Sequence, residues 1–121
     1  MSLDALEAYT EAVGAVFDTN TQLFRITSTQ FSNLKSLFFT INGVVFEFTA
    51  NAQIWPRALN TLIGGNANDI YLIIGDLGSH SGEGLDFVNG QTFMERFYTV
   101  FDTENRRVGV ANTPFTRATT N

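Results

Sequence analysis

The sequence has no cysteine, one lysine (Lys35), one histidine (His80) and no Asn-x-Ser/Thr triplet. Without cysteine the chain forms neither a disulfide framework nor a thiolate metal site. A lone histidine among scattered carboxylates gives no metal-ligand spacing either. The formal net charge is −5, which disfavours nucleic acid or an anionic membrane as a partner. We therefore expect no cofactor, no metal ion, no nucleic-acid partner and no membrane partner.

The start of the chain lacks the basic residues and the apolar run of a signal peptide, and we interpret residues 1–2 as start residues. The 121 residues are enough for one core and too few for two. Hydrophobic residues make up 44% of the chain, which is typical of a globular domain. Twelve phenylalanines among β-branched neighbours favour strands over helices, so we predict a mainly β domain of antiparallel sheets with short helices.

The clearest local signal is Asn42-Gly43, which stands between the apolar runs 37–41 and 44–48. Asn-Gly is typical of a two-residue hairpin turn. Such a turn fixes the register of the two strands and places three apolar pairs on one face. These pairs are Leu37 with Phe48, Phe39 with Phe46, and Ile41 with Val44. We predict that this face of the hairpin lies in the core.

Shorter patterns predict the other elements. Apolar periodicity and turn residues favour helices over 4–13, 28–34 and 57–63, strands over 15–17, 23–26 and 70–74, and a closing hairpin with strands 97–101 and 107–111. Asp4 with Glu7 has the capping-box form, Thr27 with Gln30 is a second candidate cap, and Pro56 is suited to a first helical position. We also expect a loop over 75–84, a return of Phe87 and Val88 to the core, and a partly ordered tail over 112–121.

The closing hairpin carries the most specific motif. Residues 98–102 read Tyr-Thr-Val-Phe-Asp and residues 107–111 read Arg-Val-Gly-Val-Ala. Together they resemble the closing segment of the pepsin-like aspartic proteases, and residues 39–44 resemble a hairpin of their C-terminal lobes. The chain looks most similar to the fungal, polyporopepsin-like branch, over nearly all of its length after residue 2. The resemblance implies a single partial pepsin-like C-terminal lobe over residues 3–111, followed by a polar tail.

The activity of that family needs residues that this sequence does not have. An aspartic protease uses two carboxylates about 3 Å apart that share one proton, so that one activates water while the other polarises the peptide carbonyl. The family supplies each carboxylate from an Asp-Thr-Gly or Asp-Ser-Gly loop, and neither tripeptide occurs here. In the register of the resemblance, the catalytic loop would stand before Leu3. A second departure is Gln91 after Gly90, where the family often has Asp.

Two Asp-Thr pairs remain as candidates. Asp18-Thr19 follows an apolar, strand-like run as a catalytic loop would, but Asn20 takes the place of the glycine. The segment after Asp18 also fits a later family strand, so we interpret Asp18 as a turn residue. Asp102 belongs to the closing hairpin, and the resemblance implies a structural role for it.

The remaining candidates carry weaker signals. They are Ser79-His80-Ser81, the pair Glu83 and Asp86, the glycine segments Gly64-Gly65 and Gly82-Glu83-Gly84, the pair Arg106-Arg107, and Trp55. Neighbours in sequence do not make a catalytic triad, the glycines lack the lysine of a phosphate loop, and two arginines do not make a nucleic-acid patch. We assign no catalytic, cofactor-binding or metal-binding residue.

Two hypotheses of different classes follow. In the first, the chain is a truncated C-terminal lobe of a pepsin-like endopeptidase that is not proteolytic on its own. Its partners would be the N-terminal lobe and a peptide substrate, it would form homo-oligomers when alone, and the resemblance implies secretion. The alternative is a free-standing, non-catalytic fungal binding protein, lectin-like or immune-active, with recognition by loops such as 75–84. An active homodimer would need one catalytic loop per chain, which is missing.

Overall fold

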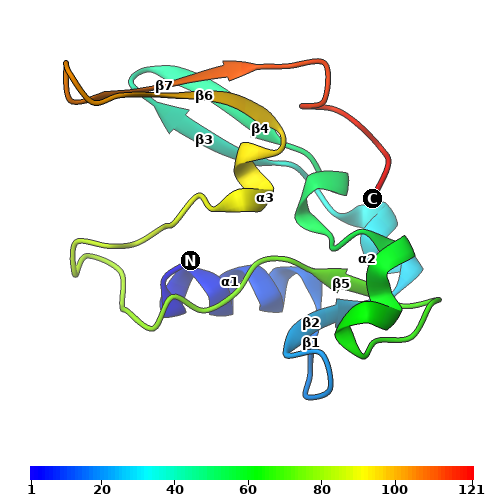
Figure 1. Ribbon diagram of the computed structural model, residues 1–121. Helices are drawn as coiled ribbons and strands as arrows, with labels where there is room; N and C mark the ends of the chain where they lie inside the picture. Colours follow the sequence, from blue (N-terminus) through cyan, green and yellow to red (C-terminus); the bar gives the residue numbers. More distant parts are fainter. The chain divides into compact units, whose positions relative to one another are not determined.

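The computed structural model describes residues 1–121 and divides the chain into two compact units (Figure 1). Unit 1 comprises residues 1–34, 53–88 and 121, and unit 2 comprises residues 35–52 and 89–120. All strand pairs in both units are antiparallel and the helices are short, as predicted. None of the helices combines the length and the apolar character that a membrane crossing requires.

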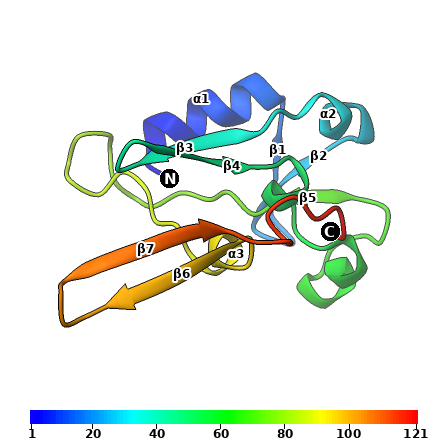
Figure 2. The ribbon, with the colours of Figure 1, turned by 90° about the horizontal axis from the view of Figure 1, so that it is seen from above.

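Unit 1 is a small sheet with helices. Its strands run in the order β1 (Val16–Asp18), β2 (Leu23–Ile26), β5 (Ile70–Leu72), and its helices are α1 (Leu3–Val13), α2 (Ser28–Asn33) and the 3₁₀ helix η2 (Arg57–Ile63), as Figure 2 shows from above. The core consists of Ile26, Ile54, Ile70 and Leu72, each at most 4% exposed. Tyr9 and Val13 of α1 pack against this core.

Unit 2 is built from two hairpins. They are β3 (Leu37–Ile41) with β4 (Val44–Phe48), and β6 (Phe97–Asp102) with β7 (Arg107–Asn112), and the one-turn helix α3 (Gln91–Met94) precedes β6 (Figure 2). A short 3₁₀ segment, η1 (Asn51–Gln53), follows β4 and ends in unit 1. Aromatic rings form the core: Phe46 lies 5.6 Å from Phe97, and Phe93 lies 4.6 Å from Phe97, between ring centroids.

The most local predictions are confirmed. The β3–β4 register pairs the three predicted couples, and Asn42 and Gly43 have the positive φ angles, 50° and 77°, of a type I′ turn. The two inner residues, Phe46 and Phe48, are buried, whereas Ile41 and Val44 at the tip stay 37% and 54% exposed. The base of the hairpin therefore lies in the core and its tip does not.

The helix starts are only partly as predicted. Thr27 and Gln30 form the predicted capping box of α2. At α1, however, the helix begins at Leu3 with Ser2 as its N-cap, and the Ser2 hydroxyl bonds to Ser81 and does not cap the helix. The Asp4 carboxylate is bound to the loop that contains His80 and Ser81. Pro56 is the residue before η2 rather than its first residue, since its ψ of 116° is extended.

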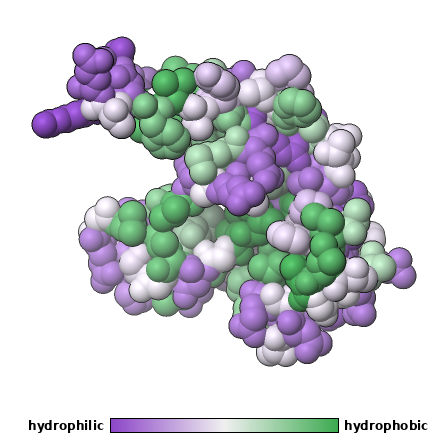
Figure 3. Space-filling view, in the orientation of Figure 1, coloured by the Kyte–Doolittle hydropathy of each residue, from purple (hydrophilic) through white to green (hydrophobic).

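Several apolar side chains remain on the surface. Phe87 and Val88, which we expected in the core, are 47% and 59% exposed. Figure 3 shows other apolar side chains (green) that reach the surface of each unit. Those at least 60% exposed are Val16, Phe38, Leu62, Tyr98, Phe101, Val108 and Phe115. We expect an isolated chain with this much exposed apolar surface to self-associate.

Candidate functional site

The first residues of the chain are held by the loop that follows β5. The Met1 ammonium donates to the Gly75 carbonyl at 2.8 Å, and the Leu3 N–H donates to the Ser79 carbonyl at 2.9 Å. Ser2 is fully buried, and its N–H donates to the Asp86 carbonyl at 2.7 Å. Residues 1–2, which we interpreted only as start residues, are thus bonded into unit 1. We call this arrangement of residues 1–4 and 75–86 the N-terminal junction.

The only histidine lies in this junction. His80 Nδ1 is 2.9 Å from the Asp4 carboxylate, which also accepts from the Ser81 N–H at 3.2 Å. The hydrogen bond from His80 lowers the pKa of Asp4, and the same bond, followed by the charge of Asp4, raises the pKa of His80. Both side chains are more than half exposed, at 64% and 52%. The sequence did not indicate this pair, because the two residues are 76 positions apart.

The serines beside His80 are engaged elsewhere. The Ser79 hydroxyl donates to the Leu85 carbonyl at 2.8 Å, and the Ser81 hydroxyl shares a 2.8 Å hydrogen bond with the Ser2 hydroxyl. A nucleophile needs a base that takes its proton, and neither hydroxyl has a hydrogen bond to His80. The segment therefore builds the loop and does not form a triad.

The two Asp-Thr candidates lie in separate turns. Asp18, at the end of β1, accepts from the Asn20 N–H at 3.0 Å and from the Thr21 hydroxyl at 3.1 Å. Asp102, at the end of β6, accepts from the Asn105 side chain and from Arg107, and these bonds hold the pKa of Asp102 below its ordinary value. Each carboxylate thus stabilises its own turn, and Asp18 belongs to unit 1 while Asp102 belongs to unit 2.

The other candidates also have structural contacts. Glu83 accepts from the His80 N–H and Asp86 from the Gly82 N–H, so these two carboxylates stabilise the loop separately. No group of three or more His, Cys, Asp or Glu side chains is placed to hold a metal ion.

The glycine, arginine and tryptophan candidates lie outside any common site. A Cβ on Gly65 would lie 2.6 Å from the Tyr71 ring, so this glycine permits close packing. Arg107 pairs with Asp102 at 2.7 Å in the closing hairpin. Trp55 donates its backbone N–H to the Tyr71 carbonyl at 2.8 Å beside the core of unit 1, which is a packing position.

Unit 1 has a groove of about 650 Å³ next to the N-terminal junction. Its walls come from α1, from β1 and β2, and from residues 74–76. Phe17 and Phe24 stack edge to face at 5.3 Å on one wall, and Glu7 and Asp76 bring carboxylates to the groove. The sequence does not indicate this groove, because its residues come from three separate segments.

The sequence also does not indicate the role of Arg96, which is only 5% exposed in unit 2. Its guanidinium donates to Asn51 Oδ1 at 2.9 Å and to the Ala118 carbonyl at 2.6 Å. The Thr116 hydroxyl donates back to the Arg96 carbonyl at 2.6 Å. The tail is therefore tied to unit 2 by a buried cation, which its polar composition alone does not predict.

Comparisons with known proteins agree on one family. The family model described as eukaryotic aspartyl protease matches residues 1–113. Polyporopepsin of Irpex lacteus is 65% identical over 118 residues, which are 98% of this chain and 35% of that protein. Human gastricsin is 32% identical over 110 residues, which are 88% of this chain and 25% of that protein.

A solved structure gives the same result for the fold. The crystal structure of an aspartic proteinase from Irpex lacteus matches with a TM-score of 0.97 and 64% sequence identity, over 100% of this chain and 36% of that one. The chain thus spans about a third of the length of these fungal relatives.

Proposed function

This chain belongs to the eukaryotic aspartyl protease family, and we propose that it forms part of the C-terminal lobe of a pepsin-like endopeptidase and does not cut peptides on its own. The resemblance to the fungal branch supports the assignment to that lobe. In the intact enzyme the chain would complete one side of a cleft that binds extended peptides. Its partners would then be the N-terminal lobe and a peptide substrate.

One observation carries the proposal that the chain alone is inactive. The mechanism needs two neighbouring carboxylates that share a proton, and each comes from an Asp-Thr-Gly or Asp-Ser-Gly loop. No such tripeptide is present in the 121 residues. The two aspartates that precede threonine are each hydrogen-bonded within their own turns.

The resemblance also bears on where the catalytic loop of the lobe would lie. The resemblance places the catalytic loop of the lobe just before Leu3, and the residues at this end are fixed by backbone hydrogen bonds to the loop 75–86. By the same resemblance, we propose that the whole protein is secreted.

The direct test is an assay of acid proteolysis with the purified 121-residue chain and an acid-denatured protein substrate. We expect no cleavage above that of a buffer control, with or without pepstatin. Asp18→Asn is the matched variant, because it removes the best remaining carboxylate and keeps the side chain's shape. Pepstatin-sensitive cleavage that disappears in Asp18→Asn would show that this chain carries its own catalytic carboxylate and would overturn the proposal.

A second test measures the intact mass of the protein purified from its source. The chain alone has a mass of 13.4 kDa. We expect a species several times heavier, since the relatives are about three times longer than this chain. A species at the mass of the chain would favour the alternative of a free-standing binding protein.

A further inference from the structure

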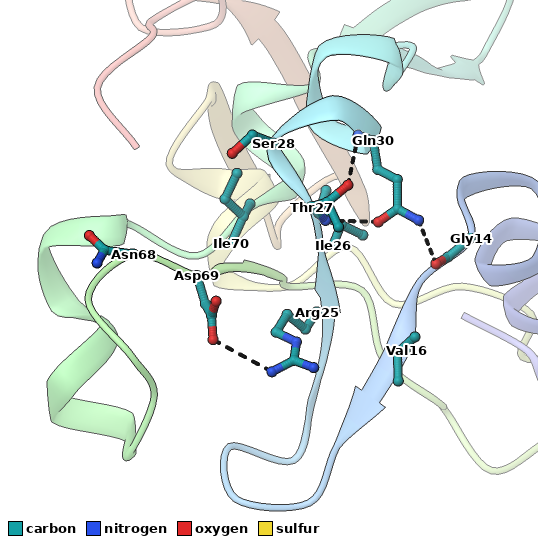
Figure 4. Close-up of a pocket in the computed structure, with 10 residues that line it drawn as sticks. All are labelled: Gly14, Val16, Arg25, Ile26, Thr27, Ser28, Gln30, Asn68, Asp69 and Ile70. Carbon is teal, nitrogen blue, oxygen red and sulfur yellow. Dashed lines mark hydrogen bonds and ion pairs between the residues drawn. The ribbon is translucent and has the colours of Figure 1, made fainter.

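Unit 1 has a second cavity, of about 380 Å³, which lies between residues 25–30 and residues 68–70 (Figure 4). Gly14 and Val16 complete its lining. Ile26 and Ile70 of the core close its floor but are only 3% and 4% exposed, so the exposed apolar surface of the lining comes from Val16, which is 60% exposed. None of the residues discussed above as a catalytic candidate contributes to this cavity.

The wall of the cavity is held rigidly by Gln30. Its amide nitrogen donates to the Gly14 carbonyl at 2.8 Å, and its amide oxygen accepts from the Thr27 N–H at 2.7 Å, as the dashed lines in Figure 4 show. Asp69, on the opposite wall, has its backbone carbonyl fixed by the fully buried Asn60 at 2.7 Å. The walls of the cavity are therefore ordered before a ligand binds, and this preorganisation reduces the entropy cost of binding.

Arg25 and Asp69 form an ion pair at this cavity. Arg25 Nη1 is 3.6 Å from Asp69 Oδ2, which is too long for a hydrogen bond, and the Arg25 side chain is 47% exposed. Figure 4 shows the Arg25 side chain lying between Asp69 and Val16. Asp69 Oδ2 already accepts from the Asn66 amide at 3.0 Å and from the Tyr71 hydroxyl at 3.3 Å. This leaves the guanidinium donors and the other oxygen, Asp69 Oδ1, without a hydrogen bond inside the chain.

The charges select the kind of ligand. A ligand with only a carboxylate would bind Arg25 but would face the Asp69 carboxylate, and a ligand with only an ammonium group would face the guanidinium. A ligand that carries a carboxylate and an ammonium group close together can bind Arg25 and Asp69 at the same time. Such a ligand has a net charge of zero, as the Arg25–Asp69 pair does. An aliphatic body on such a ligand would cover the exposed side chain of Val16.

From these observations we propose that the cavity is a binding site for a small apolar zwitterion, an aliphatic α-amino acid, with its carboxylate on Arg25 and its ammonium group on Asp69. The Ser28 hydroxyl and the Asn68 amide, which have no partner in the chain, line the cavity and complete its polar rim. The proposal concerns unit 1 alone and does not depend on whether the chain belongs to an active protease.

The test uses the full 121-residue chain and three probes in a nitrogen–proton correlation NMR titration. The probes are L-leucine, 4-methylpentanoate, which lacks the ammonium group, and isoamylamine, which lacks the carboxylate. We expect saturable shifts of the amide signals of residues 25–28 and 68–70 with L-leucine, with an affinity in the millimolar range that is usual for so small a ligand. Each single-charge probe should bind at least about tenfold more weakly, because each loses one charge-assisted contact.

Substitutions give an independent readout. Arg25→Gln and Asp69→Asn each remove one charge while keeping a polar side chain of similar shape, and each should weaken L-leucine at least about tenfold. Arg106→Gln is the matched control, because it removes one arginine from an exposed turn of unit 2 and should leave the affinity unchanged. Absence of saturable shifts with L-leucine would overturn the proposal. Equal binding of 4-methylpentanoate would also overturn it, since the cavity would then be a simple anion site.

Discussion

At the scale of single residues, the buried polar contacts of unit 1 connect elements that are far apart in sequence. The Tyr9 hydroxyl on α1 donates to Gln53 Oε1 at 2.8 Å, and Gln53 is fully buried. Burial raises the pKa of Tyr9, so the phenol stays protonated and remains a donor at all ordinary pH values. A buried acceptor that loses its donor costs about 1–3 kcal/mol, which is a large part of a small domain's stability.

We expect Tyr9→Phe to lower the free energy of unfolding by about 1–2 kcal/mol, because it removes the donor and keeps the ring. Urea unfolding followed by circular dichroism measures this change. Tyr98→Phe is the control, since Tyr98 is 65% exposed and its loss of a hydroxyl should change stability by less than about 0.5 kcal/mol. Equal effects of the two substitutions would mean that the Tyr9–Gln53 bond adds no stability.

We expect the pair of His80 and Asp4 to make the N-terminal junction sensitive to pH. The pKa of His80 is raised by the hydrogen bond to Asp4, with smaller contributions from the charges of Glu7 and Asp76. Its stabilising contribution is therefore complete below the ordinary pKa of about 6.5 and is lost as the pH rises through the raised value. The pKa of Asp4 is lowered by the bond from His80, so its contribution is present above the ordinary value of about 3.9 and is lost as the pH falls through the lowered value. The pair should thus act best between about pH 4 and pH 6.5.

An NMR titration of the His80 ring protons checks this prediction. We expect an apparent pKa above the value of about 6.5 for a free histidine, and a return towards that value in Asp4→Asn. The backbone amides of residues 77–81 should titrate together with the ring if the pair holds the junction. A normal pKa in the unsubstituted chain would show that the two side chains are not paired in solution.

At the scale of elements, the β3–β4 hairpin depends on its turn. Gly43 has a φ of 77° and no atom within 4 Å of a Cβ placed on it, so a substitution there meets backbone strain alone. We expect Gly43→Ala to cost about 1 kcal/mol of unfolding free energy. Gly75→Ala is the control, because Gly75 also has open space around it but no positive φ. If Gly75→Ala lowered the free energy of unfolding more than Gly43→Ala, the positive φ of Gly43 would not be what makes that position sensitive to substitution.

The sequence was informative for elements whose signals are local. Asn42-Gly43 determined a strand register, and Thr27 with Gln30 determined a helix start, because each depends on contacts within a few residues. Asp4 is the opposite case: α1 begins at Leu3, and the Asp4 carboxylate is bound by a loop 76 residues away in the sequence and does not cap the helix. Phe87 and Val88 show a similar limit, because an apolar segment indicates that burial is favourable but not which surface covers it.

For the candidate sites, too, the sequence was informative only where the signal is local. The absence of an Asp-Thr-Gly or Asp-Ser-Gly tripeptide is readable from the sequence alone. The groove of unit 1 and the Arg25–Asp69 cavity are not, because each joins side chains from three or more separate segments. Only the tertiary structure brings such residues together.

At the scale of the whole molecule, exposed apolar side chains favour self-association of the isolated chain. Phe101 and Val108 are paired across β6 and β7 and are 64% and 60% exposed. We expect the chain to form dimers or larger species in sedimentation velocity runs at rising concentration. Substitution of both residues by threonine keeps the strand propensity and should shift the distribution towards monomer. A monodisperse monomer at high concentration would contradict this prediction.

The division of the chain into two units has a consequence for the order of events during synthesis. Each unit is assembled from separate stretches, and the last strand of unit 2 ends at residue 112. Unit 1 cannot close its sheet until β5 has left the ribosome, and by then β3 and β4 have emerged without the aromatic residues of α3 and β6 that pack on them. The phenylalanines of the β3–β4 hairpin therefore stay uncovered until almost the whole chain has been synthesised. A chaperone would be most useful during this interval.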